Sequence, residues 1–202
     1  MTKIKFCGLR RAADIEAANE LKPDYAGFVF AEKSRRAVTR ETATELRYLL
    51  DPGIPAVGVF VDTPVETVAA LLNDGIIDLA QLHGHEDANY IAALRRQTDK
   101  PVIQAFRVRS ANDAARAEAS IADLILLDAG AGDGKTFEWE LAESVRRPYF
   151  LAGGLTPENA ESAMNRLHPF ALDVSSGIET DGMKDPGKMR AFMRTVRGEK
   201  RK

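Results

Sequence analysis

Eight short hydrophobic runs recur along this 202-residue chain at nearly even intervals, and they constrain its fold more than any other feature. Each run is rich in Val, Ile, Leu or Phe and has the length of a strand. Their first residues are separated by 22, 31, 22, 24, 21, 25 and 22 residues, a step that matches a strand, a loop and a three-turn helix together. We expect strands over residues 3–7, 25–30, 56–61, 78–82, 102–106, 123–128, 148–152 and 170–174.

The segments between the runs carry the signals of helices. Residues 39–51 place their apolar side chains on one face, and Thr39 is positioned to cap the first turn. Residues 63–75 open with a Thr-Pro pair, and Glu66 completes a capping box with Thr63. Strands that alternate with helices in this way form a parallel sheet joined by right-handed crossovers.

Eight such units are enough to close a sheet into a barrel, which leaves no exposed sheet edge. The rival is an open, doubly wound sheet, whose first turn should carry G-x-G-x-x-G; here the first run leads into CGLRR. We therefore expect an α/β fold, a single (β/α)8 TIM barrel of eight parallel strands with an outer ring of helices. The barrel would form one domain over residues 1–197, followed by a charged tail over 198–202.

Composition excludes several classes of protein. A chain that is 45% hydrophobic and 29% charged is typical of a soluble globular protein. A net charge of -2 gives no reason to expect a nucleic acid or an anionic membrane as partner. The single cysteine excludes an internal disulfide and a multi-cysteine metal site, and no apolar run approaches the ~20 residues of a membrane helix. We expect a cytoplasmic protein, monomeric or homodimeric, that binds neither nucleic acid nor membrane.

Two reactive groups stand at the ends of predicted strands. A barrel of this kind builds its site from the loops that follow its strands, and Cys7 ends the first run while Asp128 ends the sixth. A thiolate accepts a proton, and a carboxyl group whose pKa is raised by partial burial donates one. The pair is a candidate general base and general acid. The alternatives are a small buried filler for Cys7 and a loop cap for Asp128.

The turns after the seventh and eighth runs are rich in small residues. LAGGLTPEN contains Gly154, and DVSSGIE contains Ser175, Ser176 and Gly177, with Asp173 just before them. Barrels often bind phosphate after these two strands through backbone N–H groups, ideally at a short helix, which here would start near Ser176. Neither turn contains Lys or Arg, and Lys184 lies further along. Tight turns without a ligand are the alternative.

Two further loops complete the predicted rim. KSRR, residues 33–36, is either a solvated turn or a carboxylate site, because arginine holds a carboxylate through two hydrogen bonds; we prefer Arg36 for that role. AGAGDGKTFEW, residues 129–139, fails the P-loop pattern because Ala129 stands where the first glycine is needed. We expect a long loop here, which either acts as a lid over a ligand or is a flexible surface loop.

The histidines raise the possibility of a divalent metal ion. His83 and His85, with Asp62 and Asp128 on other loops, are residue types that bind such an ion. Gly84 interrupts the strand geometry that would hold both imidazoles on one side. We therefore expect His83 to be a site or core histidine and His85 to begin the next helix.

The motifs KFCGLR, GFVFAEKSRR, VGVFVD, QLHG, ILLDAGAGDGKTFEW, LAGGLTPENA and ALDVSSGIE, in this order, resemble the phosphoribosylanthranilate isomerases of tryptophan biosynthesis. The resemblance covers essentially the whole chain. It implies a small barrel enzyme without metal or cofactor. Its reaction would be the Amadori rearrangement of N-(5-phosphoribosyl)anthranilate to 1-(2-carboxyphenylamino)-1-deoxyribulose 5-phosphate.

The resemblance also implies residue roles. Asp128 would be the general acid that protonates the furanose ring oxygen, and Cys7 the general base that removes the proton from C2 of the sugar. Arg36 would face the anthranilate carboxylate. The full set of expected substrate-binding residues is Arg36, His83, Gly154, Asp173, Ser175, Ser176 and Gly177.

Two other functions remain open at this point. One is a metal-dependent pentose-phosphate epimerase on the same barrel, which would use His83, His85 and Asp62. The other is a barrel that binds phosphorylated ligands without catalysis. The joint presence of Cys7 and Asp128 on one rim argues against the second.

Overall fold

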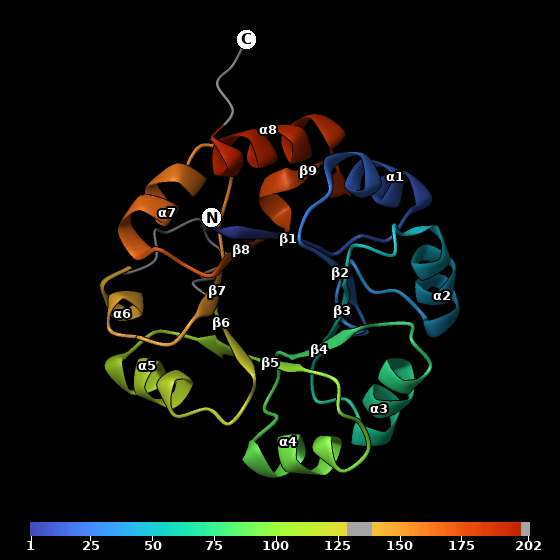
Figure 1. The fold of residues 1–202 in the computed structure, drawn as a ribbon, viewed down its shortest axis with the longest axis vertical. Helices are drawn as coiled ribbons and strands as arrows, with labels where there is room; N and C mark the ends of the chain where they lie inside the picture. Colours follow the sequence, from blue (N-terminus) through green and yellow to red (C-terminus); the bar gives the residue numbers. More distant parts are fainter. Residues whose placement is uncertain (129–138, 199–202) are drawn as a thin grey trace.

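Parallel strands form a closed barrel in the computed structural model, which describes residues 1–128 and 139–198 of the chain (Figure 1). Hydrogen-bonded neighbours follow chain order from β1 to β8, and β8 pairs with β1 to close the ring. The expected (β/α)8 fold is thereby confirmed. The strands are β1 (Lys3–Cys7), β2 (Tyr25–Val29), β3 (Ala56–Phe60), β4 (Leu79–Leu82), β5 (Val102–Arg107), β6 (Leu124–Asp128), β7 (Tyr149–Ala152) and β8 (Ala171–Val174).

Helices surround this barrel as an outer ring (Figure 1). They are α1 (Ala12–Leu21), α2 (Arg40–Leu49), α3 (Val65–Asn73), α4 (Ala88–Arg95), α5 (Ala111–Glu118), α6 (Trp139–Glu143), α7 (Ala160–Leu167) and α8 (Pro186–Arg197). Between β8 and α8 the chain forms a short 3-10 helix, η1 (Ser176–Ile178), and a hairpin of β9 (Glu179–Thr180) and β10 (Met183–Lys184).

The helix starts show one correct prediction and one error. Thr39 caps α2 as expected, because its side chain accepts a hydrogen bond from the Thr42 backbone. At α3 the cap position is Pro64, whose ψ of 137° is extended, so the helix begins one residue later than expected. Proline has no side-chain acceptor, and the predicted capping box of Thr63 and Glu66 is therefore wrong.

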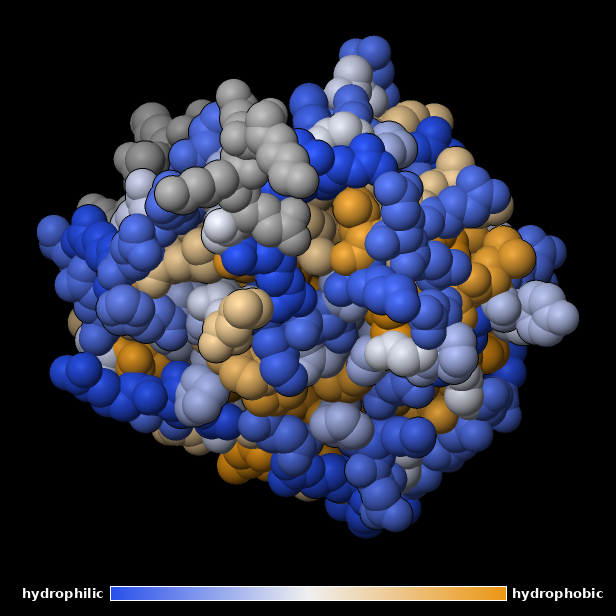
Figure 2. Space-filling model, turned by 45° about the horizontal axis from the view of Figure 1, so that its top comes forward, coloured by the Kyte–Doolittle hydropathy of each residue, from blue (hydrophilic) through white to orange (hydrophobic). Residues whose placement is uncertain are grey.

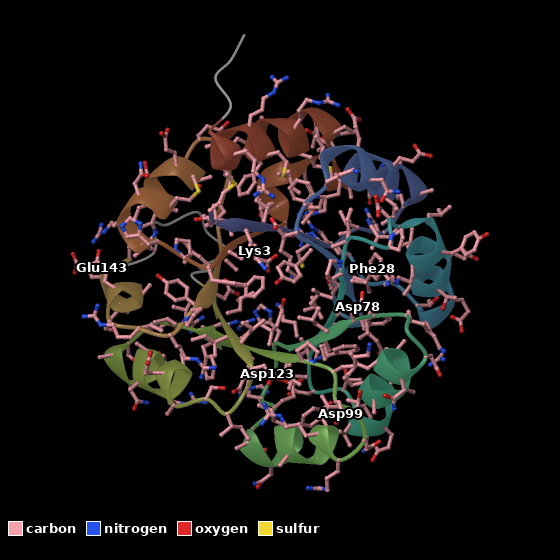
Figure 3. The ribbon with its side chains drawn as sticks, viewed as in Figure 1. Lys3, Phe28, Asp78, Asp99, Asp123 and Glu143 are labelled. Carbon is pink, nitrogen blue, oxygen red and sulfur yellow. The ribbon has the colours of Figure 1, made fainter. Side chains whose placement is uncertain are left out.

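The core has two layers separated by the strands. Side chains alternate along each strand, so that Phe6 and Phe28 pack outward among the helices; Figure 3 shows Phe28 on the helix side of β2. Tyr25, Leu126 and Phe150 belong to a second cluster that fills the barrel interior. Both clusters are buried. Because buried side chains are closely packed, they hold the strands in place, and the strand ends form a rigid rim.

Strand β1 carries three polar or reactive side chains into the interior, one above another. Lys3 lies at the N-terminal end, inside the ring of strands in Figure 3, with its ammonium 5.6 Å from the Tyr25 ring centre and 4.9 Å from that of Phe170. Lys5 and Cys7 follow at two-residue intervals. This spacing carries Cys7 to the C-terminal rim of the barrel.

The surface is largely hydrophilic on the face that Figure 2 shows, with hydrophobic side chains visible in small areas between polar ones. No helix in the described ranges is both long and apolar enough to cross a membrane. The division into a domain over 1–197 and a tail over 198–202 stays a prediction, because residues 199–202 lie outside the described part.

Candidate active site

Most of the predicted site residues lie at one end of the barrel, because parallel strands all end there. Cys7 and Asp128 are the last residues of β1 and β6. His83 directly follows β4, and Ser175 directly follows β8. These strands therefore bring a thiol, a carboxyl, an imidazole and a hydroxyl to one rim.

The Cys7 side chain is buried against Val29 and Val59. Its register partner on β2 is Gly27, and a Cβ at that position would lie 3.1 Å from the Cys7 sulfur. The glycine thus leaves the space that the thiol occupies.

Charged groups on both sides act on this thiol. Burial raises the pKa of Cys7 above its ordinary value; Lys5 opposes this rise, Asp173 adds to it, and Lys184 opposes it. Burial therefore makes the Cys7 thiolate a stronger base than a solvent-exposed one.

Asp128 is joined to His83 across the rim. His83 Nε2 lies 3.1 Å from Asp128 Oδ2. Both side chains are about one-fifth exposed, at 21% and 18% respectively. A carboxyl group in this position is reachable by a ligand and is partly withdrawn from water, as the apolar run before it predicts.

Asp173 lies one layer below the rim, inside the barrel. Both of its carboxylate oxygens accept hydrogen bonds from Lys5 Nζ at 3.1 Å, and Lys5 Nζ donates a third to Gln81 Oε1 at 2.9 Å. All three side chains are buried. The expected contact of Asp173 with a substrate stays a prediction, because the structure shows its carboxylate paired with Lys5.

Arg36 is held by Glu179, a residue that the sequence did not single out. Arg36 Nε and Nη2 donate to the two Glu179 carboxylate oxygens at 2.6 and 2.8 Å. The Arg36 stem crosses Gly8, where φ is +80° and a Cβ would lie 2.5 Å from Arg36 Cδ. The guanidinium is thus fixed beside the Cys7 loop. Its role toward a ligand carboxylate stays a prediction, for which Nη1 and the second hydrogen of Nη2 remain.

Glu179 is the hub of a cationic cluster. Arg35 Nη2 and Lys184 Nζ donate to it as well, at 2.9 and 2.8 Å. Burial alone would raise the pKa of Glu179, but hydrogen bonds from Arg36 and Lys184 lower it to about 2. The carboxylate therefore stays charged at any physiological pH.

The two predicted phosphate loops are in contact. A Cβ on Gly177 would lie 1.8 Å from the Leu155 carbonyl oxygen, so only glycine permits this approach. Gly154 has a φ of +63°, and its carbonyl accepts a hydrogen bond from Asn159 at 2.9 Å. The short helix expected near Ser176 is present as η1, and it places backbone N–H groups at the rim.

Lys184 adds a positive charge, which neither of the two loops contains. The β9–β10 hairpin returns it to the loop after β8, where Lys184 Nζ donates to the Ser175 carbonyl at 2.9 Å. Ser175 Oγ in turn donates to the Cys7 carbonyl at 3.0 Å. The phosphate loops and the thiol are therefore one connected structure. The Asp181-Gly182 pair between β9 and β10, with φ values of +51° and +74°, is a sequence signal that could have found this hairpin.

The histidines have different partners. His83 Nδ1 lies 3.0 Å from Gln81 Nε2, opposite its contact with Asp128. His85 Nδ1 lies 3.0 Å from Asp62 Oδ2, and the His85 side chain is 92% exposed. Within the described ranges no three His, Cys, Asp or Glu side chains are grouped to hold a metal ion. The geometry gives the metal-dependent alternative no support.

A groove of about 630 Å³ runs along the outside of β5 between α4 and α5. It reaches the rim at His83 and Arg107, but neither Cys7 nor Asp128 lines it. The loop over 129–139, expected to act as a lid, lies outside the described residues up to Trp139. The placement of Cys7 and Asp128 at one site is therefore inferred from their positions at the ends of β1 and β6. The contact of Asp128 with His83 at the same rim agrees with it.

Comparison with known proteins agrees with this geometry. Residues 4–195 match the family model described as N-(5'phosphoribosyl)anthranilate (PRA) isomerase. N-(5'-phosphoribosyl)anthranilate isomerase of Endomicrobium trichonymphae is 44% identical over 98% of this chain and 99% of its own length. The crystal structure of the Thermotoga maritima phosphoribosyl anthranilate isomerase has a TM-score of 0.90 and 34% identity, over 98% of this chain and 100% of that one.

A further solved structure carries a ligand. It is a phosphoribosyl anthranilate isomerase in complex with reduced 1-(o-carboxyphenylamino)-1-deoxyribulose 5-phosphate, with a TM-score of 0.87 and 34% identity over 98% of this chain and all of that one.

Proposed function

The chain belongs to the N-(5'-phosphoribosyl)anthranilate isomerase family, and on that premise we propose that Cys7 and Asp128 make the proton transfers of its reaction. The enzyme isomerises N-(5'-phosphoribosyl)anthranilate, an aminoaldose, to the aminoketose 1-(2-carboxyphenylamino)-1-deoxyribulose 5-phosphate, a step of tryptophan biosynthesis. The chemistry is an Amadori rearrangement.

Asp128 acts first, as the general acid. It gives its proton to the furanose ring oxygen; the bond from C1 to that oxygen breaks, and the anthranilate nitrogen lone pair forms a C1–N double bond. The resulting iminium withdraws electrons from C2 and makes its hydrogen acidic. A positioned acid contributes roughly 10²–10⁴-fold to such a step.

Cys7 acts second, as the general base. Its thiolate takes the proton from C2, and the electron pair moves to form a C1–C2 double bond while the nitrogen regains its lone pair. The enolamine then gains a proton at C1 and loses the one on the C2 hydroxyl, which gives the ketone. A thiolate suits this step because burial makes it strongly basic.

The substrate is held at both of its anionic ends. We propose that the phosphate binds the backbone N–H groups of Gly154, Ser176 and Gly177, and that Arg36 faces the anthranilate carboxylate. A relative has been solved in complex with reduced 1-(o-carboxyphenylamino)-1-deoxyribulose 5-phosphate, which supports a ligand that carries both a phosphate and a carboxylate. Two fixed ends hold C1 and C2 of the sugar between the thiol and the carboxyl group.

One observation carries the proposal: β1 and β6 end at the same rim, so that Cys7 and Asp128 approach one ligand from different strands. The test is turnover of Cys7→Ala and Asp128→Asn, followed by the loss of anthranilate fluorescence. We expect each to fall at least about 100-fold with an unchanged circular dichroism spectrum.

The matched control is Asp123→Asn, because Asp123 lies at the opposite end of the strand that carries Asp128 and pairs with Arg95 on the outer surface. We expect near wild-type turnover from it. Turnover of either site variant within a few-fold of wild type would overturn the assignment. Location in the cytoplasm and a monomeric or homodimeric state stay predictions.

A further inference from the structure

A line of hydrogen bonds crosses the barrel interior and connects the regions of the base and the acid. Lys5 Nζ donates to Gln81 Oε1 at 2.9 Å, Gln81 Nε2 lies 3.0 Å from His83 Nδ1, and His83 Nε2 lies 3.1 Å from Asp128 Oδ2. The line begins at a fully buried ammonium and ends at the proposed general acid.

The donors in this line can be assigned from Lys5 alone. An ammonium has donors and no acceptor, so Gln81 must turn its oxygen toward Lys5 and its NH2 group toward His83. His83 Nδ1 then accepts, and it carries no proton. The proton of the neutral ring is therefore on Nε2, which donates to Asp128 Oδ2. In every hydrogen bond of this line, the donor is therefore on the Lys5 side and the acceptor on the Asp128 side.

The same ammonium is next to the proposed general base. Lys5 and Cys7 are two residues apart on β1 and share the inward face. A Cβ on Gly27 would lie 3.1 Å from Cys7 Sγ and 3.3 Å from Lys5 Cε, which places both side chains against one point of β2. Gly27 leaves the space through which the Lys5 stem reaches Gln81 on β4.

Among the described residues, four charged groups face Cys7 from the elements packed around it. They are Lys5 from β1, Asp173 from β8, Lys184 from β10 and Arg36 from the loop after β2. Lys184 and Arg36 both form ion pairs with Glu179. Lys5 forms an ion pair with Asp173. Of these four groups, only Lys5 also donates a hydrogen bond to Gln81.

We propose that Lys5 is a positioning residue for both proton transfers. Its ammonium stabilises the thiolate form of Cys7, and through Gln81 it holds His83 in the tautomer that donates to Asp128. This inference rests on the proposed roles of Cys7 and Asp128.

The first arm of the test follows the ionisation of Cys7 directly. The chain has one cysteine, so selectively 13C-labelled cysteine gives a single Cβ signal whose pH titration reports the thiol alone. We expect Lys5→Met to raise the Cys7 pKa and Asp173→Asn to lower it, each by about one unit or more. A merely structural ion pair would not shift the thiol in opposite directions, and shifts of the same sign or none would overturn the proposal.

The second arm measures the tautomer of His83 in the wild-type protein. It therefore tests the proposal even if Lys5→Met does not fold. In the 15N NMR spectrum of the wild-type protein at neutral pH, we expect His83 Nδ1 to show the shift of an unprotonated nitrogen and Nε2 that of a protonated one. The reverse assignment, or a doubly protonated ring, would contradict the proposal.

Gln81→Glu provides a third arm, because a carboxylate accepts from His83 instead of donating to it. We expect the His83 nitrogen pattern to change and kcat to fall at least tenfold with little change in KM, whereas Gln97→Glu on the surface changes neither. Unchanged kcat in Gln81→Glu would overturn the tautomer argument. The NMR arms use ligand-free protein, so they can fail while Cys7→Ala and Asp128→Asn still abolish turnover, and the two proposals are distinguished.

Discussion

Glu179 accepts two hydrogen bonds from Arg36, at 2.6 Å from Nε and 2.8 Å from Nη2, so that the pair is bidentate and the guanidinium plane is fixed. A fixed guanidinium loses less entropy when it binds a second carboxylate through its remaining N–H groups. On the proposed role of Arg36, Glu179 thus orients the guanidinium for the anthranilate carboxylate.

Glu179→Gln should raise KM for the substrate about tenfold, which corresponds to ~1.4 kcal/mol, with a smaller effect on kcat. The reason is that the amide cannot accept from both Arg36 nitrogens. Steady-state kinetics checks this, with Arg35→Ala as control because the Arg35 side chain is 62% exposed and lies at the edge of the cluster. An unchanged KM in Glu179→Gln would show that substrate binding does not depend on the orientation of Arg36 by Glu179.

The same carboxylate links stability to pH. Burial would raise the pKa of Glu179, but hydrogen bonds from Arg36 and Lys184 lower it from 4.5 to about 2. A folded-state pKa below the unfolded value stabilises the protein above pH 4.5, and this contribution is lost as the pH falls toward 2. Urea unfolding at pH 7 and at pH 3 should show a loss that includes at most about 2 kcal/mol from this group.

Glu179→Gln is the comparison for that measurement. Its unfolding free energy should depend less on pH over the same window, because the amide does not titrate. Equal pH dependence in the two proteins would contradict the ion-pair account.

Gly27→Ala tests the space shared by Cys7 and Lys5. The added methyl group would lie 3.1 Å from the Cys7 sulfur and 3.3 Å from Lys5 Cε, closer than ordinary contacts. We expect unfolding free energy to fall by about 1–3 kcal/mol and turnover to fall several-fold. Gly53→Ala, in an exposed turn, is the control. A Gly27→Ala enzyme with normal turnover would mean that the two side chains are not confined.

Gly177→Ala tests the phosphate loops. Its Cβ would overlap the Leu155 carbonyl oxygen at 1.8 Å, so the loops after β7 and β8 must move apart. We expect inhibition by inorganic phosphate to weaken at least tenfold and KM to rise. Inhibition that is as strong as in the wild type would place the phosphate elsewhere.

The barrel was predictable because each strand is an apolar run that ends near a turn signal, and the observed strands differ from the expected ones by a residue at most. Cys7, Asp128 and the glycine turns were predictable for the same reason, since a strand end fixes its position on the rim. Lys5 carried a partial signal, a charge between Ile4 and Phe6 in a buried strand.

The contacts between side chains from distant parts of the chain were not predictable. Lys5 meets Gln81, and Arg36 meets Glu179, across 76 and 143 residues of chain. Strand periodicity gives the face on which a side chain lies, but barrel closure decides which faces meet. The β9–β10 hairpin, which returns Lys184 to Ser175, is too short to leave a periodic pattern.

The most direct test of the central claim, that Asp128 opens the ring and Cys7 removes the C2 proton, is the kinetic isotope effect of substrate deuterated at C2 of the ribose. In Cys7→Ser the removal of this hydrogen should limit the rate, so kcat should show a primary effect well above one. In Asp128→Asn ring opening should limit the rate, and the effect should be close to one. A large effect in Asp128→Asn together with none in Cys7→Ser would contradict the account.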